Sequence, residues 1–156
     1  MKKFMAMTMA MVMAAMALTG CGGSDAADDK ASGDIPAIGI NQYGQHASLD
    51  NCREGFLQGL EEAGLKEGVD YKIEYQNAGF DDNAATQIAQ NFSAKNVALM
   101  CAIATPSATA CYAAAEDKDI PVIFTAITDP EEAKLTGGNI TGTSDKLPIE
   151  GQLQLI

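Results

Sequence analysis

Two hydrophobic patterns alternate along residues 35–156, and the alternation predicts strands separated by helices. Short apolar runs, or runs in which apolar and polar residues alternate, predict strands. Apolar residues spaced three or four apart predict helices, because that spacing places them on one helical face. The strands are predicted at residues 35–41, 69–76, 97–103, 120–124 and 139–143. The helices are predicted to begin at Ser48, at Asp81 or Asp82, at Thr105 and at Ile149.

The order of these elements predicts an α/β fold. Strands that alternate with helices at this spacing form a parallel sheet with right-handed crossovers and helices on both faces. We expect the strand order 2-1-3-4-5. Residues 97–103 are apolar without alternation, as in a central strand covered on both faces. Residues 69–76 have one polar face, as in a strand near an edge of the sheet.

The junction between the third strand and the third helix has the pattern of an anion-binding site. Thr105 is a suitable N-cap, and Pro106 suits the first helical position because proline has no N–H group to leave unpaired. The N–H groups of Ser107 and Ala108 should then point out of the helix, at the carboxyl end of a strand. With the hydroxyls of Thr105 and Ser107 they could bind a carboxylate. An ordinary capped helix start remains the alternative.

The first 34 residues differ from the rest in composition. Residues 1–20 have two lysines followed by an uncharged apolar run, which predicts a signal peptide. The run ends in Leu18-Thr19-Gly20-Cys21, which looks like a bacterial lipoprotein box with Cys21 as the lipidated residue. A chance cysteine after a secretory signal is the alternative. Residues 21–34 are small and polar and predict a flexible tether, so the folded part is expected to be residues 35–156.

Charge and motif content exclude several classes of protein. The chain has 10 basic and 21 acidic residues and a formal net charge of −11, which argues against nucleic acid as a partner. Gly39 and Gly44 have P-loop spacing, but Gln45 and His46 stand where lysine and serine or threonine are required. Dinucleotide-binding, zinc-ligand and nucleophile-elbow motifs do not occur either. We therefore expect no metal, no cofactor and no enzymatic activity. A catalytic pairing of His46, the only histidine, with a cysteine is the alternative.

Three cysteines remain after Cys21. Cys52 and Cys111 fall on apolar helix faces and Cys101 falls in an apolar strand, so we interpret all three as small buried hydrophobic residues. A disulfide between Cys101 and Cys111 is left open.

Each predicted strand ends in residues with hydroxyl, amide or carboxyl side chains. In a parallel sheet these ends meet at one edge, where ligands bind. Lys146 is the only basic residue in those loops, which disfavours a dicarboxylate or phosphate ligand. A zwitterion needs one anion site and one acid, and Asp129 or Asp145 could pair with its ammonium. Asp129 could instead cap the turn that begins at Pro130.

Several segments together resemble the solute-binding lipoproteins of ABC importers, in the subgroup linked to tryptophan and tyrosine uptake. The segments that carry the resemblance are Ile38-Gly39-Ile40, His46–Asp50, Gly55-Phe56 with Gly59-Leu60, Tyr75–Ala78, Ala102–Ser107, Phe124–Pro130, Asn139–Gly142 and Ser144-Asp145. The resemblance implies a Rossmann-like first lobe of a two-lobe periplasmic-binding-protein fold, with the second lobe absent from this chain.

The resemblance also implies a function. It predicts an extracytoplasmic, lipid-anchored receptor that passes an aromatic amino acid to ABC permease subunits, with the membrane reached through the lipid. The alternative is a truncated or isolated lobe that senses or interacts, or a fragment without function. The ring of the ligand is expected near Tyr43 or Leu49. The candidate ligand-binding residues are Gln42, His46, Ser48, Thr105, Ser107, Ala108, Thr125, Thr128, Asp129, Ser144 and Asp145.

Overall fold

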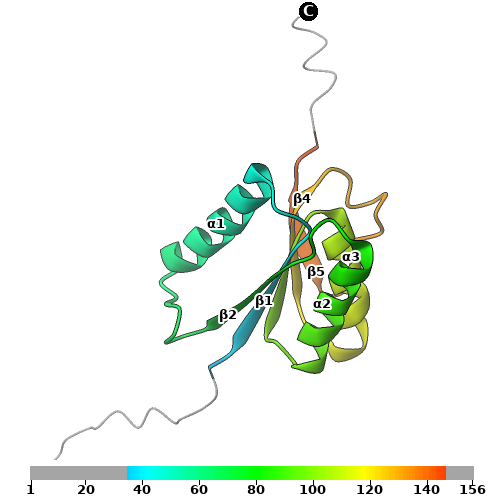
Figure 1. Ribbon diagram of the computed structural model, residues 1–156. Helices are drawn as coiled ribbons and strands as arrows, with labels where there is room; N and C mark the ends of the chain where they lie inside the picture. The colour runs from blue at the N-terminus through cyan, green and yellow to red at the C-terminus, as the bar shows by residue number, and fades with distance from the viewer. Residues whose placement is uncertain (1–34, 147–156) are drawn as a thin grey trace, which may run out of the picture. The chain divides into compact units, whose positions relative to one another are not determined.

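The computed structural model describes residues 35–146, which form a five-stranded parallel sheet with helices on both faces (Figure 1). The strand order is β2-β1-β3-β4-β5, as the sequence predicts. The strands are β1 (Ala37–Gln42), β2 (Lys72–Asn77), β3 (Leu99–Ile103), β4 (Val122–Ile127) and β5 (Ile140–Ser144). The helices are α1 (Ala47–Glu62), α2 (Asp82–Ala94) and α3 (Thr105–Ala115), with a 3-10 turn at Glu116–Lys118.

Helix α1 covers one face of the sheet, and α2 and α3 cover the other (Figure 1). Buried residues of β1 and β3 pack against half-buried apolar residues of α1, including Phe56 and Leu60. On the opposite face Phe92 of α2 is fully buried, and its ring fills the space above Gly39 of β1. A Cβ at position 39 would lie 2.6 Å from Cδ2 of Phe92. Gly39 therefore lets α2 approach the sheet closely.

The burial of the strands agrees with their predicted places. Met100–Ile103 of β3 are fully buried at the centre of the sheet. Strand β2 lies at the edge and alternates half-buried with exposed residues along part of its length. It begins at Lys72 rather than at Val69, because Lys66 and Asp70 close a turn just before it.

Strand β4 is longer than predicted. Thr125–Ile127 were expected in a loop but continue the strand to Ile127. The register with β5 shifts between Phe124 and Ile127, and Ala126 has a φ of 58°. A bulge of this kind keeps a chain paired with its neighbour while it changes direction, and the apolar-run criterion does not detect it.

The capping residues of α1 and α2 are His46 and Asp81. The predicted cap Ser48 lies inside the first turn of α1, so that prediction is wrong. Asp81 accepts a hydrogen bond from the Ala84 N–H, which decides between the two aspartates proposed for α2.

Some predictions lie outside the described residues. They are the signal peptide at residues 1–20, lipidation of Cys21, the tether at residues 21–34 and the helix that begins at Ile149. Within residues 35–146, no helix has the length and apolar character needed to cross a membrane.

Candidate functional site

The carboxyl ends of all five strands meet at one edge of the sheet, as required for a ligand site in an open α/β fold. Helices α1, α2 and α3 begin at this edge, since each follows a strand. Polar residues end three of the strands, Gln42, Asn77 and Ser144, and Thr128 directly follows the end of β4. The candidate residues from distant parts of the sequence therefore share one edge.

Helix α3 begins one residue earlier than predicted. Its N-cap is Ala104, and Thr105 and Pro106 are the first two helical residues. The Ala108 N–H donates to the Ala104 carbonyl at 3.0 Å, so it is not free for a ligand. Helix geometry leaves the N–H groups of Thr105 and Ser107 without an intrahelical acceptor. The predicted anion site thus loses the Ala108 N–H and gains the Thr105 N–H. The Ser107 N–H has no intrahelical acceptor, but it belongs to a fully buried residue.

Ser107 turns its side chain inward. The residue is fully buried, and its hydroxyl donates to Oδ1 of Asn41 at 3.2 Å. The prediction that this hydroxyl faces a ligand is wrong, because it is used inside the protein. Thr105 is half-buried and lines a hollow of ≈ 570 Å³ between α2 and α3, together with Asp82 and Pro106. Its hydroxyl is the one at this helix start that reaches the surface.

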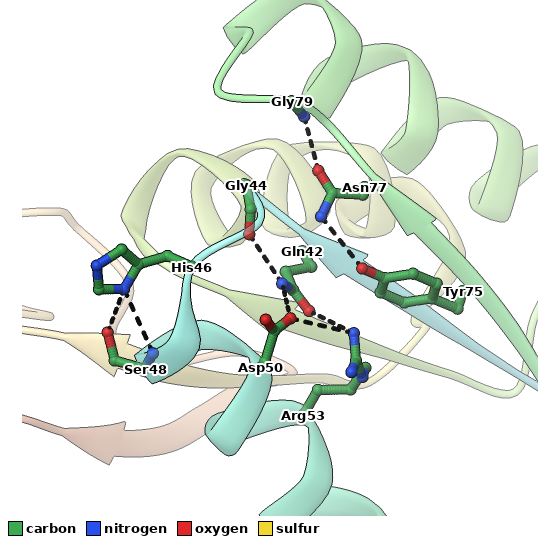
Figure 2. A network of polar contacts seen from close by, with 9 residues as sticks. All are labelled: Gln42, Gly44, His46, Ser48, Asp50, Arg53, Tyr75, Asn77 and Gly79. Atoms are coloured by element: carbon green, nitrogen blue, oxygen red, sulfur yellow. Dashed lines mark hydrogen bonds and ion pairs between the residues drawn. The ribbon is translucent and has the colours of Figure 1, made fainter.

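Gln42 holds the loop after β1 against α1 (Figure 2). It is fully buried, and Nε2 donates to the Gly44 carbonyl at 2.8 Å and to Oδ1 of Asp50 at 2.9 Å. Its Oε1 accepts from Arg53 at 3.2 Å, and the guanidinium lies 4.8 Å from the ring centroid of Tyr75. These partners occupy the amide that was predicted to contact a ligand.

Arg53 was missed by the sequence analysis. Arg53 lies on α1, beside Gln42 of β1 and Tyr75 of β2, and brings a positive charge to the edge (Figure 2). Whether the Arg53 side chain contacts β1 depends on the angle between α1 and the sheet, and hydrophobic periodicity does not indicate that angle.

His46 and Ser48 form a capping pair. The His46 ring accepts from the Ser48 N–H at 3.3 Å, and Nδ1 lies 2.6 Å from the Ser48 hydroxyl. Both residues are exposed at the edge. They remain near the candidate site, but their mutual contacts explain why these residue types open α1.

Two aromatic residues join the loops that follow β1 and β2. The rings of Tyr43 and Phe80 meet edge to face with centroids 5.7 Å apart. The Tyr43 hydroxyl donates to Asp82 Oδ1 at 2.7 Å, and this hydrogen bond raises the pKa of the phenol. Phe80 is 55% exposed and has a φ of 64°. Sequence analysis missed Phe80. An aromatic residue that follows a glycine in a loop, as Phe80 follows Gly79, is only a weak indication of an exposed aromatic side chain near a binding site.

The far side of the edge is formed by β4, β5 and the turn between them. Asp129 Oδ1 accepts from the N–H groups of Glu131 and Glu132, and Oδ2 lies 3.4 Å from Nζ of Lys146. These contacts, with the Glu132 N–H the largest, lower the pKa of Asp129. Asp129 is therefore the cap of the turn after Pro130. The exposed carboxylate of Asp145 has no partner within residues 35–146.

Hydroxyl groups connect this side of the edge. Thr143 and Thr125 share a hydrogen bond of 3.2 Å between their hydroxyls, and Ser144 donates to the Thr128 carbonyl at 3.0 Å. The Ala104 N–H donates to the Thr125 carbonyl at 3.0 Å. The start of α3 is therefore tied directly to the end of β4, and the candidates on β4, β5 and α3 form one group.

The three cysteines within residues 35–146 are free thiols. Cys52, Cys101 and Cys111 are free, so the disulfide left open above does not form here. Burial raises the pKa of Cys101 and of Cys111 to about 12. Cys52 is half-buried rather than buried. No cluster of metal-ligating side chains occurs within residues 35–146.

Comparisons with known proteins place this geometry in a family. The sequence profile described as "ABC transporter substrate binding protein" matches residues 37–156. The tyrosine-binding protein of Clostridioides difficile (strain R20291) is 42% identical over 167 aligned positions, which cover 99% of this chain and 48% of that protein.

Solved structures agree. A ligand-free, open substrate-binding protein with adhesive properties from Clostridium difficile is 39% identical, with a TM-score of 0.73 over 78% of this chain and 42% of its own. A Streptococcus pneumoniae protein in complex with L-Trp is 37% identical, with a TM-score of 0.71 over 79% and 43%. A leucine-binding protein from Thermotoga maritima, 16% identical, shares the fold. The chain spans about half the length of the tyrosine-binding relative and less than half the length of these solved structures.

Proposed function

The chain belongs to the family of ABC transporter substrate-binding proteins, and from this premise we propose that it is the lipid-anchored solute-binding component of an ABC importer for an aromatic amino acid. The family consists of extracytoplasmic solute-binding proteins and not of enzymes. The proposed partners are the permease subunits of the importer. The proposed ligands are tyrosine and tryptophan, since one relative is named for tyrosine and another was solved with L-Trp.

The start of α3 is the observation that carries the proposal. The helix lacks a side-chain cap, so the N–H group of the half-buried Thr105 has no intrahelical acceptor and lies at the carboxyl edge of the sheet. The positive end of the helix dipole and the Thr105 hydroxyl favour an anion at the same place. We assign the carboxylate of the amino acid to this site.

The ammonium of the ligand is assigned to Asp145. Asp129 already accepts two backbone N–H groups and pairs with Lys146. Asp145 is exposed on the neighbouring strand end without a side-chain partner in the described part of the chain. Its charge is therefore free to pair with a cation.

The ring of the ligand is assigned to the side of Tyr43 rather than Leu49. Leu49 packs against the buried cluster beneath α1. Tyr43 and Phe80 instead present an aromatic surface at the edge, with Phe80 more than half exposed. Aromatic rings prefer the edge-to-face and offset contacts that such a pair offers.

Titration of the full-length protein tests the ligand, with any coding sequence that follows residue 156 included. Binding of tyrosine, tryptophan, phenylalanine, leucine and glutamate is measured by calorimetry. We expect an aromatic amino acid to bind tightest. Tighter binding of leucine or glutamate would contradict the assignment.

Fatty-acid labelling tests the anchor. A clickable fatty-acid analogue supplied to expressing bacteria should label the natural protein and not Cys21→Ala. The variant Cys52→Ala is the matched control and should be labelled like the natural protein. Equal labelling of Cys21→Ala would exclude this lipid anchor.

A further inference from the structure

Asn41 is a fully buried polar residue whose contacts reach two helices. It is the second-last residue of β1. Its Nδ2 donates to the Ala85 carbonyl of α2 at 2.9 Å and lies 3.5 Å from Sγ of Cys111 in α3. Its Oδ1 accepts the Ser107 hydroxyl of α3 at 3.2 Å. One side chain thus joins β1 to the first turns of both helices on that face.

The partners of Asn41 are themselves shielded from solvent. Ala85, Ser107 and Cys111 are all fully buried. In such surroundings a hydrogen bond is strong and a polar group that loses its partner is costly, so a satisfied network selects one arrangement of the elements. The apolar packing between α2 and α3 alone would permit small shifts of one helix along the other.

The start of α3 needs such a constraint. Its N-cap, Ala104, has φ 78° and ψ 155°, a combination that glycine adopts readily and other residues avoid. No side-chain hydrogen bond caps the helix. Strained backbone persists only where the surroundings hold it in place. The Ala104 N–H is held by the Thr125 carbonyl on one side, and Ser107 is held by Asn41 on the other.

We propose that Asn41 is a positioning residue for the ligand: it holds the uncapped first turn of α3 at the carboxyl edge from the core side, and it acts on affinity without touching the ligand. An ordinary N-cap side chain would occupy the outward N–H groups of the helix. Asn41 secures the same turn through the inward Ser107 hydroxyl instead, so no capping side chain covers the outward end of the helix. The inference rests on the proposed function only for the identity of the ligand.

The test compares a double variant with a matched control in the full-length protein. Asn41→Leu with Ser107→Ala removes both polar partners together, which avoids leaving one of the pair orphaned in the core. Val97→Ala is the control. Val97 is buried in the same apolar cluster as Ala85 and Cys111, but it precedes β3, whereas α3 follows the other end of that strand. Two quantities are measured: hydrogen exchange of the Ala108 amide, and the Kd values for L-tyrosine and for tyramine, which lacks the carboxylate.

In the double variant we expect Ala108 exchange to be at least tenfold faster relative to the amides of β3, and the Kd for L-tyrosine to rise about tenfold. The Kd for tyramine should change less than threefold, because tyramine has no carboxylate to bind at the start of α3. The control should change exchange at Ala108 and in β3 alike and should leave the ratio of the two Kd values unchanged. Ser107→Ala alone should show the same effects, smaller, if the double variant does not fold.

Unchanged Ala108 exchange would overturn the inference, as would faster exchange with an unchanged Kd for L-tyrosine. A natural protein that binds neither tyrosine nor tryptophan would contradict the proposed function instead. The exchange of Ala108 then decides by itself whether Asn41 positions α3.

Discussion

At the scale of single residues, several polar side chains predicted to face a ligand are used to build the edge. Gln42 is enclosed by Gly44, Asp50 and Arg53, and Ser107 is bound to Asn41. A hydroxyl or amide at a strand end is equally suited to either use, because both satisfy a buried hydrogen-bonding group. Which use applies follows from the direction of the side chain.

The two acids of the edge should differ in their effect on binding. Asp145→Asn should weaken tyrosine binding about tenfold, because it removes an unpaired charge proposed to meet the ammonium. Asp129→Asn should weaken it less, since Lys146 already balances that charge and asparagine can still cap the turn. Calorimetry on both variants measures the difference. A larger loss in Asp129→Asn would move the ammonium to the turn after β4.

The buried thiols should be unreactive in the folded protein. The pKa of Cys101 and Cys111 rises from the ordinary 9.0 to about 12, so neither forms thiolate at pH 8. Iodoacetamide at pH 8 should label Cys52 first and reach the other two only in urea, as peptide mass spectrometry would show. Cys101 labelled as fast as Cys52 without denaturant would mean that the sheet opens readily.

The same shifts give stability a pH dependence. Between about pH 9 and 12 the unfolded chain loses these thiol protons while the folded chain keeps them. Stability is therefore fully present below pH 9 and declines above it. The free energy of unfolding measured in urea should be lower at pH 10 than at pH 8. The difference between the two pH values should be smaller in Cys101→Val.

At the scale of elements, glycines decide how closely loops and helices approach the sheet. The loop after β1 passes beneath the ring of Phe80 at Gly44, where a Cβ would collide with the ring. The loops after β1 and β2 are further joined by the bond from the Phe80 N–H to the Tyr43 carbonyl at 2.8 Å. Close packing against Phe92 and Phe80 explains why positions 39 and 44 are glycine. The P-loop spacing of these two glycines therefore needs no phosphate site to explain it.

Alanine at two glycine positions should have opposite effects. Gly44→Ala should lower the free energy of unfolding by about 1–3 kcal/mol, because the Phe80 ring must move. Gly59→Ala lies in α1 with open space around it and should raise that free energy by about 0.5–1 kcal/mol through helix propensity. Chemical denaturation of both variants measures the two changes. A neutral Gly44→Ala would show that the contact between these loops is loose.

At the scale of the molecule, the two faces of the sheet are covered unequally. Helices α2 and α3 bury five and four residues, whereas α1 buries none, among the residues that the structure describes. The apolar side chains of α1 are only half-buried against the sheet. The chain also spans about half the length of its relatives. Burial drives folding in proportion to area, so this chain has less of that driving force than its longer relatives.

The printed chain of 156 residues should therefore be marginally stable and prone to dimerise. We expect it to bind an apolar fluorescent dye, to show concentration-dependent unfolding and to bind amino acids weakly. Sedimentation and thermal scans at several concentrations test this. A sharp, concentration-independent transition at high temperature would show that the lobe is sufficient by itself.

The sequence by itself determined the α/β class, the parallel order 2-1-3-4-5 and the edge at which the candidate residues gather. Hydrophobic periodicity is a local property. The residues of a strand therefore indicate by themselves whether it lies at the centre of the sheet, like β3, or at its edge, like β2. The resemblance carried by short segments then indicated the family that residues 37–156 match.

Only the tertiary structure decided which polar groups at that edge are free. Asn41 and Ser107 are 66 positions apart, and Arg53 reaches Gln42 from a different element. Whether a side chain turns into the core or toward solvent depends on the angle and distance between packed elements, which no local pattern records. The start of α3 shows the difference: its position follows from Pro106, but its uncapped end follows from the way Ala104, Asn41 and Thr125 hold it.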